Sequence, residues 1–263
     1  LALTEQHNSF LQLEAANNLK ILKPVTSIHS DASLLLIAHN GQLSISQDIS
    51  FDEASAGSLL LQTTGCQSNI YINDTINFQS AAGLNVSAGG NLFINDKLLL
   101  NTRATAQLFS AQDLIIGQNV INRGIGQIKI KTGGSLIMGD GAQTHALQLA
   151  SVKGSLSLDI GQNVELKAGA NDGSFVQIGA DNELVSANIC FENIGGDLLL
   201  WGGQTTGKDS CYALIGHGAD IGACNIRRGN VVFKHIGGEV QLKGGRTEHS
   251  FAQVGHLRGI DNG

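Results

Sequence analysis

The second half of the chain repeats itself, and this repetition limits the fold more than any other sequence feature. Three segments align residue for residue from Ile160, Ile194 and Ile236, and each reads Ile-Gly, two further residues, then an alternating apolar stretch. The equivalent isoleucines are 34 and 42 residues apart. Periods of this size are typical of solenoids and related repeat architectures.

Each copy is followed by a second shared motif that begins with an aromatic residue. These motifs are Phe175-Val-Gln-Ile-Gly179, Tyr212-Ala-Leu-Ile-Gly216 and Phe251-Ala-Gln-Val-Gly255. The first half of the chain repeats more loosely, for example in Leu84-Asn-Val-Ser-Ala-Gly-Gly-Asn-Leu-Phe-Ile94. Apolar residues that alternate over three to five positions, bounded by Gly, Asn or Ser, predict short β-strands.

The composition agrees with a stack of short strands joined by sharp corners. The 263 residues include 34 Gly and a single proline, Pro24, while 42% are hydrophobic and only 14% are charged. This hydrophobicity excludes a disordered chain, and the lack of a third-residue glycine period excludes collagen. Glycine adopts the positive φ angles that sharp corners often need, and proline would remove a donor from strands that pair on both edges.

These features predict an all-β fold, a parallel β-solenoid wound as a right-handed β-helix with loop excursions of variable length. We expect one continuous solenoid, with short irregular repeats over residues 1–153 and longer repeats over 154–263. A β-sandwich or propeller would instead use longer strands and Asn-Gly or Asp-Gly hairpins. Coils of about 20 residues would give on the order of a dozen coils. The units of 34 and 42 residues are either two coils each or one coil with an excursion.

The charge pattern argues against nucleic-acid and membrane partners. The net charge of −6 is evenly divided, with 7 basic and 10 acidic residues in 1–150, and 9 basic and 12 acidic residues in 151–263. Nucleic-acid binding needs a basic footprint, and the only adjacent basic pair is Arg227-Arg228. The longest apolar run, from Leu34 to Ala38, is too short to cross a bilayer, so we expect no transmembrane segment.

The repeats resemble filamentous-haemagglutinin-type exoproteins of bacteria, which are exported by two-partner secretion or as autotransporter passengers. The resemblance rests on the coil from Leu84 to Ile94 and on the segment from Gly244 to His256, and it is strongest from about residue 154 onward. It implies a secreted or surface-displayed β-helical rod that attaches to host surfaces or displays a tip domain. The chain lacks the Asn-Pro motifs of the family's secretion domain, so we expect an interior segment of a longer protein.

Four aromatic residues are candidate binding residues. Val176 and Ile178 share one strand face with small or aliphatic equivalents in the other copies, which places Phe175, Tyr212 and Phe251 on the opposite, outward face. Such a ladder is either a contact surface or a set of stacked rings covered by loops. Trp201 occupies a position where the other copies carry Lys167 and Lys243, so it either contacts a sugar or partner chain or packs on a lysine stem.

Histidine and cysteine residues give weaker signals. His217 and His256 occupy equivalent positions, but no third ligand with suitable spacing follows, so we expect a turn-stabilising role and no metal site. The four cysteines, Cys66, Cys190, Cys211 and Cys224, contain no Cys-x-x-Cys pair. Partly buried free thiols are expected, with a Cys211–Cys224 bridge as the alternative.

No motif for nucleophilic catalysis, zinc or phosphate binding is present, so we predict a non-enzymatic protein without a cofactor. The leading hypothesis is an adhesin or stalk segment at the bacterial outer surface or secreted from it. Its partners would be a host-cell surface protein or glycan and an outer-membrane transporter for export. The alternatives are a polysaccharide lyase or hydrolase and an extracellular fibre subunit that associates end to end.

Overall fold

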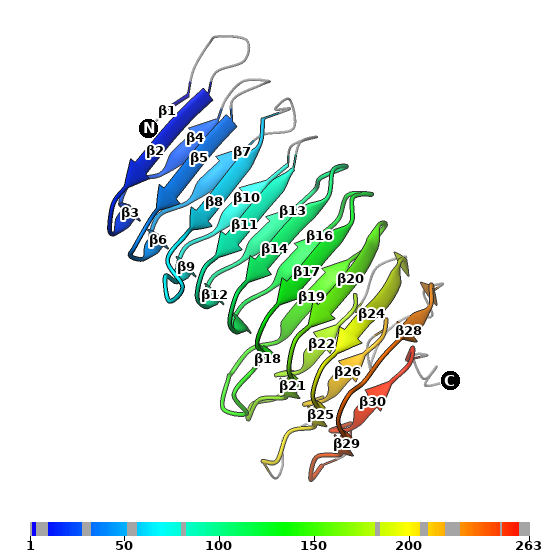
Figure 1. The fold of residues 1–263 in the computed structure, drawn as a ribbon. Helices are drawn as coiled ribbons and strands as arrows, with labels where there is room; N and C mark the ends of the chain where they lie inside the picture. The colour runs from blue at the N-terminus through cyan, green and yellow to red at the C-terminus, as the bar shows by residue number, and fades with distance from the viewer. Residues whose placement is uncertain are drawn as a thin grey trace.

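The protein is a parallel β-solenoid built from three long sheets. The computed structural model describes residues 2–3, 10–27, 33–51, 57–79, 83–181, 185–205, 210–218, 227–247 and 249–257. Figure 1 shows the strands stacked along one axis, with the two ends of the chain at opposite ends of the stack. Among the described residues, no helix is long and apolar enough to span a membrane.

Each coil contributes one strand to each sheet. Sheet A has ten strands and sheets B and C have nine each. Sheet A contains β1 (Ala2–Leu3), β4 (Val25–Ser27), β7 (Ile49–Phe51), β10 (Ile76–Phe78), β13 (Leu98–Leu100), β16 (Val120–Asn122), β19 (Leu147–Ser151), β22 (Val176–Ile178), β26 (Ala213–Ile215) and β30 (Ala252–Val254). Sheet B contains β2 (Phe10–Ala15), β5 (Ser33–Ala38), β8 (Leu59–Thr63), β11 (Leu84–Ala88), β14 (Ala106–Ser110), β17 (Ile128–Thr132), β20 (Ser155–Ile160), β24 (Asn188–Ile194) and β28 (Val231–Phe233). Sheet C contains β3 (Leu19–Ile21), β6 (Leu43–Ile45), β9 (Ile70–Ile72), β12 (Leu92–Ile94), β15 (Leu114–Ile116), β18 (Leu136–Met138), β21 (Val164–Lys167), β25 (Leu198–Trp201) and β29 (Val240–Lys243).

Hydrogen bonds between equivalent corner residues of successive coils give the coil lengths. Asn91 and Asp113, which are equivalent in neighbouring short coils, lie 22 residues apart in the chain. The corresponding offset is 34 residues from Asn163 to Asp197 and 42 residues from Asp197 to Glu239. These two longer offsets equal the spacings of the repeated isoleucines, so each of those repeat units is a single coil with an excursion.

The predicted β-solenoid class is confirmed, whereas the expected number of coils is wrong. Sheets of nine or ten strands contain fewer coils than the expected dozen. The reason is that the C-terminal coils are longer than the sequence pattern suggested, because their excursions use residues that would otherwise build further coils.

The core is a set of ladders of identical or similar aliphatic residues. In sheet C, Leu92, Leu114 and Leu136 pair in successive coils, and all three are buried. The predicted inward pair Val176 and Ile178 is fully buried as well. Each fully buried Leu or Ile contributes about 2 kcal/mol of hydrophobic stabilisation, so the stack is held mainly by this narrow apolar interior.

The Gly-Gly corners between sheets B and C need glycine for a reason other than the one predicted. In the described part of the chain, every residue with a positive φ angle lies outside these Gly-Gly pairs. Instead, a Cβ atom on Gly133 would lie 2.3 Å from the Ala111 carbonyl oxygen, and one on Gly195 would lie 2.1 Å from that of Gly161. The prediction of φ > 0 thus fails at these corners, because the close approach of stacked coils requires glycine there, whereas it holds at other turns such as Gly179 and Gly216.

The long coils place extra residues over the outside of sheet A. The short strands β23 (Val185–Ser186) and β27 (Arg227–Arg228) pair in parallel as a separate small sheet. Val185 and Ala187 then pack with Ala150, Val152 and Ala180 in a second, smaller apolar cluster. The excursions of the C-terminal coils therefore cover part of a sheet face that would otherwise meet solvent.

Candidate functional site

The predicted ladder of aromatic rings is present. Phe175 and Tyr212 stack with ring centroids 4.8 Å apart, and Tyr212 and Phe251 stack at 4.9 Å, both with nearly parallel planes. The three rings lie just before β22, β26 and β30, at equivalent positions in three consecutive coils. Because stacked strands repeat at about 4.8 Å, equivalent rings are brought into stacking contact by the coil spacing itself.

The ladder is less exposed than an outward face implies. Tyr212 is 1% exposed, and the neighbouring side chains on the same face, Gln177 and Leu214, are fully buried. The chain after β26 folds back over this face, where Gln177 donates through Nε2 to the carbonyl oxygens of Gly216 (2.8 Å) and Gly218 (3.0 Å). For Tyr212 the structure thus shows the alternative of a stacked, covered ring, while a binding role of the partly exposed Phe175 and Phe251 stays a prediction.

Trp201 lies in a ladder with lysines. The register pairs Lys167 with Trp201 and Trp201 with Lys243. The Lys167 Nζ atom lies 4.8 Å from the centroid of the indole ring, and the same ammonium group donates to Glu165 at 2.8 Å. The lysine contact that we gave as one alternative is thus present, and contact of Trp201 with a sugar or partner stays a prediction.

His217 and His256 form another ladder, in which the ring nitrogens hold the backbone of adjacent coils. The rings stack at 5.0 Å. The Nδ1 atom of His217 accepts from the Ala180 N–H (3.2 Å), and Nδ1 of His256 accepts from the His217 N–H (3.0 Å). Their Nε2 atoms lie 2.9 Å and 3.0 Å from the carbonyl oxygens of Ala187 and Gly229, so Nε2 carries the proton in both rings. The predicted turn-stabilising role is confirmed.

The cysteines differ in their surroundings. Cys66 is an exposed free thiol, and Cys190 is a partly buried free thiol on sheet B. Burial, together with the neighbouring Glu192 carboxylate, raises the pKa of Cys190 and favours the unreactive thiol form. The buried Cys211 is a thiol that donates to the Asn171 carbonyl oxygen (2.9 Å), as the thiol expectation requires. Cys224, the other half of the alternative Cys211–Cys224 bridge, lies outside the described residues.

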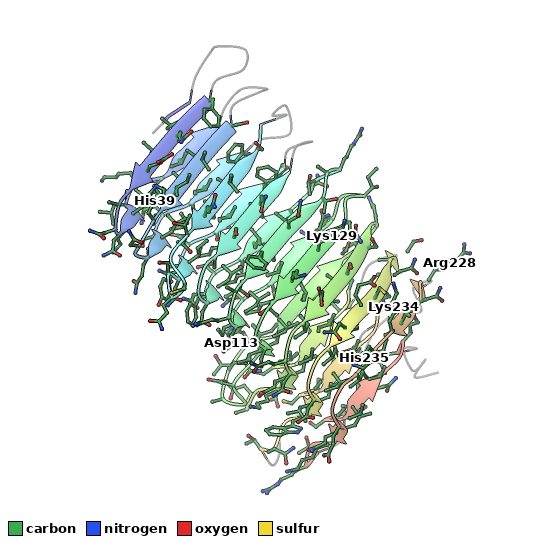
Figure 2. The ribbon with its side chains drawn as sticks, viewed as in Figure 1. His39, Asp113, Lys129, Arg228, Lys234 and His235 are labelled. Carbon is green, nitrogen blue, oxygen red and sulfur yellow. The ribbon has the colours of Figure 1, made fainter. Side chains whose placement is uncertain are left out.

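The outer face of sheet B forms a shallow groove that sequence reasoning missed. It has a volume of about 530 Å³ and crosses five strands, from β8 to β20. Amide, hydroxyl and lysine side chains share this face with the half-buried ring of Phe109, and Figure 2 labels Lys129 on it. The outward side chains that line the groove are Leu60, Gln62, Asn85, Ser87, Gln107, Phe109, Lys129, Lys131, Ser157 and Asp159. An aromatic ring among amide, hydroxyl and charged side chains suits an extended polar ligand such as a glycan.

Ion pairs lie along the same face toward the C-terminal coils. Lys131 contacts Asp159 at 3.2 Å. One coil further, β24 has an irregular register in which Glu192 is the extra residue, and its carboxylate accepts from the Lys234 ammonium group. That hydrogen bond, followed by the one from Cys190, lowers the pKa of Glu192, and the same carboxylate raises the pKa of Lys234. Because Lys131 and Asp159 also line the groove, charged groups extend from the groove toward the C-terminal coils.

A ladder of Asn and Asp side chains at the corner between sheets B and C was also missed. In each case a side-chain Oδ1 accepts from a backbone N–H of the next coil: Asn91 from Asp113 (2.9 Å), Asp113 from Ser135 (2.7 Å) and Asn163 from Asp197 (2.8 Å). Each of these residues stands directly before a strand of sheet C. The signal in the sequence is an Asn or Asp before most of the Leu-x-Ile and Val-x-Leu strands, and it becomes visible once the coils are aligned.

Comparison of the chain with known protein families, with curated proteins and with solved structures found no match. Within the described ranges, no three His, Cys, Asp or Glu side chains gather closely enough to hold a metal ion. The site that the structure offers is therefore a surface: the sheet B groove, with the partly covered aromatic ladder on another side of the solenoid.

Proposed function

We propose that the protein is a non-enzymatic β-helical rod of a bacterial exoprotein of the filamentous-haemagglutinin type, secreted or displayed at the outer surface. It acts as an attachment segment or as a stalk that carries a tip domain. Its partners are a host-cell surface glycan or protein and the outer-membrane transporter that exports the longer chain.

The observation that carries this proposal is the continuity of the solenoid. Three parallel sheets of nine or ten strands run from β1 to β30 and share one apolar core. A stack paired across so many strands is a stiff spacer, because each coil is held by its neighbours on both sides. Such a spacer suits a protein that must hold a binding surface away from a cell.

The groove on sheet B supports the attachment part of the proposal. Its lining side chains come from five successive coils and repeat at the strand spacing of about 4.8 Å. A ligand that contacts several coils gains affinity from many weak contacts at once. This arrangement suits an extended polymer better than a small molecule.

A second candidate function, end-to-end assembly into a fibre, is favoured by the last described coil. Val240 and Leu242 in β29 pair with the buried Leu198 and Leu200, yet they are 53% and 48% exposed. These core-type side chains offer a surface on which another coil can stack, either the following coil of a longer chain or a coil of a second copy. Light scattering over a range of concentrations tests this: growth that Leu242→Lys abolishes supports assembly, and a strict monomer at every concentration contradicts it.

Cell binding tests the leading proposal. The purified chain is applied to cultured host cells, together with a variant of the sheet B groove, Gln107→Ser with Phe109→Ser. A matched variant changes one aromatic and one amide residue on the outer face of sheet C, Phe93→Ser with Asn95→Ser. We expect the groove variant alone to lose binding. Absence of binding by the unaltered chain would remove the attachment role and leave the stalk, and cleavage of an acidic polysaccharide would contradict the non-enzymatic assignment.

A further inference from the structure

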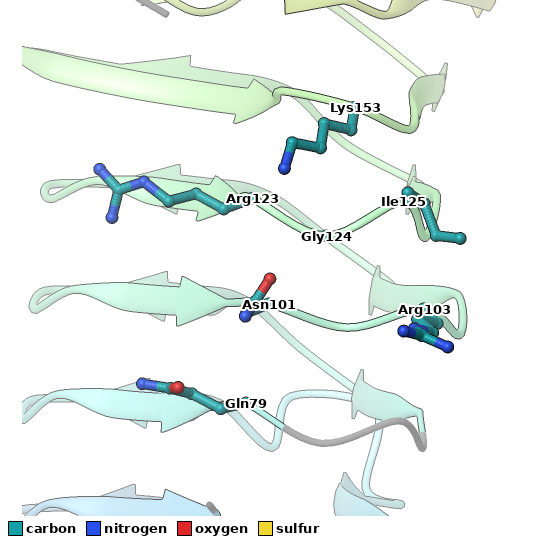
Figure 3. A pocket seen from close by; sticks show the side chains of 7 residues that line it. All are labelled: Gln79, Asn101, Arg103, Arg123, Gly124, Ile125 and Lys153. Atoms are coloured by element: carbon teal, nitrogen blue, oxygen red, sulfur yellow. The ribbon is translucent and has the colours of Figure 1, made fainter. Parts of the chain in front are cut away.

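A second groove, lined by other residues than the groove on sheet B, lies at the corner between sheets A and B. It follows β10, β13, β16 and β19, and its volume is about 510 Å³ (Figure 3). Its lining consists of three basic residues, two amides, a glycine and one aliphatic residue: Arg103, Arg123, Lys153, Gln79, Asn101, Gly124 and Ile125. These residues come from successive coils, so the groove runs along the axis of the solenoid.

The groove concentrates positive charge on an acidic protein. The chain has a net charge of −6 and only 16 basic residues, yet three of them line this corner, and none of the described residues that line it is acidic. All three are exposed. Within the described part of the chain, neither Arg103 nor Lys153 takes part in an ion pair. A local positive field of this kind attracts anions, and the guanidinium groups offer fork-shaped donor pairs for oxyanions.

The backbone beneath the basic residues is held in place by a buried amide. Asn122 is fully buried; its Nδ2 donates to the Gly126 carbonyl oxygen (2.8 Å), and its Oδ1 accepts from the Gly124 N–H (3.0 Å) and the Thr102 N–H (3.2 Å). A Cβ atom on Gly124 would lie 2.2 Å from the Thr102 carbonyl oxygen, so this corner packs tightly on the coil before it. The basic side chains therefore leave from a fixed turn, which reduces the ordering needed on binding.

The spacing of the charges indicates the size of the ligand. The coil register places Arg103, Ile125 and Lys153 in one ladder, because Ala106 pairs with Ile128 and Ile128 with Leu156. Arg103 and Lys153 are thus two coils apart, a span of roughly 10 Å along the axis at the usual strand spacing. Ile125 lies between them and is 63% exposed. Ile125 offers an apolar contact between the cationic side chains of Arg103 and Lys153, and the amides lie at one end of the groove. This order of groups suits a sugar chain that carries an oxyanion on successive units.

We propose that this corner groove binds an acidic glycan, with its carboxylate or sulfate groups held by Arg103, Arg123 and Lys153. The proposal deepens the attachment role proposed above by naming a ligand class. A single-stranded nucleic acid would extend along the acidic remainder of the solenoid and is expected to bind more weakly.

Fluorescence anisotropy on the purified chain tests the site, with labelled oligogalacturonate as the carboxylate ligand, dextran sulfate as the sulfate ligand and neutral dextran as the control. The site variant combines Arg103→Gln, Arg123→Gln and Lys153→Gln. The matched control combines Lys20→Gln, Lys23→Gln and Lys97→Gln, which removes the same charge from exposed positions elsewhere. At low salt we expect the site variant to bind at least one acidic glycan at least about tenfold more weakly, since one charge-assisted hydrogen bond contributes about that factor. The control is expected to bind within about twofold of the unaltered chain.

Three results would overturn the proposal: no binding of either acidic glycan, an equal loss in both triple variants, or an oligonucleotide that binds as tightly as the glycans. The difference in affinity between oligogalacturonate and dextran sulfate shows whether the groove prefers carboxylate or sulfate groups. Because the assay uses purified components, its failure leaves cell attachment through sheet B untouched. Conversely, if the sheet B variant loses cell binding but still binds the acidic glycans, the two grooves act independently.

Discussion

The short coils from β11 to β18 and the long coils from β20 to β30 keep the same three strands but differ in what joins them. The corner between sheets B and C is constant: four positions separate Ala88 from Leu92, Thr132 from Leu136 and Ile194 from Leu198. The other corners grow, so that the offset between equivalent residues of successive coils rises from 22 residues at Asn91 to 42 residues at Asp197.

This difference shows which parts of a coil specify the stack. The ladders of apolar residues set the register, because a shift by one residue would turn the inward side chains outward. Extra residues at the remaining corners are tolerated, since each doubling of loop length adds only about 0.6 kcal/mol of closure entropy. The long coils use these extra residues to cover sheet A, which the short coils leave open.

The largest expected effect contrasts a covered coil with the last described coil. Leu200 and Leu242 pair in the same ladder, but Leu200 is fully buried and Leu242 is 48% exposed. Leu200→Ala should lower the free energy of unfolding by about 3 kcal/mol, because it leaves a cavity in the core. Leu242→Ala should cost less than about 1 kcal/mol, because that side chain is half solvated. Chemical denaturation measures both, and equal losses would contradict the open last coil.

The next largest loss of stability is expected from a substitution at the corner between sheets B and C. Gly195→Ala would place a Cβ atom 2.1 Å from the Gly161 carbonyl oxygen and should cost about 2 kcal/mol through overpacking. Gly244→Ala is the control in a variable corner, where the nearest atom to the new Cβ is the Ser250 carbonyl oxygen at 3.9 Å. Thermal unfolding should separate the two variants. If they unfolded at the same temperature, close coil approach would not be the reason for glycine.

A smaller loss of stability is expected from the Asn ladder, and it should be the same in the short and the long coils. Asn91 lies in the short coils and Asn163 in the long ones, and each accepts one N–H of the next coil at similar distances. Alanine at either position should cost about 1 kcal/mol, the usual net contribution of a hydrogen bond. A clear difference between the two measured losses would show that the long coils depend on other contacts at this corner.

The smallest effect is a pH dependence that comes from an ion pair of the long coils. The hydrogen bond from Lys234 lowers the pKa of the exposed Glu192, so this pair stabilises the fold above the ordinary glutamate pKa. The contribution is lost as the pH falls through the lowered pKa of Glu192. Glu192→Gln should slightly reduce the denaturation midpoint at pH 7 and leave it unchanged at pH 2. An equal reduction at both pH values would assign the effect to packing.

The fold could be predicted from the sequence because ladders repeat residue types at equal positions. Val176, Ile178 and the stacked Phe175, Tyr212 and Phe251 follow from that alignment. The coil length could not be derived, since a strand pattern does not show which corner absorbs an insertion. For the same reason the corner groove was missed: Arg103, Arg123 and Lys153 come together only when the register is known. The burial of Tyr212 depends on a chain that folds back over sheet A, which no local pattern reveals.

Hydrogen–deuterium exchange on the intact chain tests most directly whether the two regions form one solenoid, on which the rod-like function rests. Strand amides from β11 to β26 should exchange slowly throughout, with β28, β29 and β30 faster at the open end. If β20 to β26 exchanged as a separate, much faster unit than β11 to β18, the long coils would not belong to the same continuous stack, and the account of a single rod would be wrong.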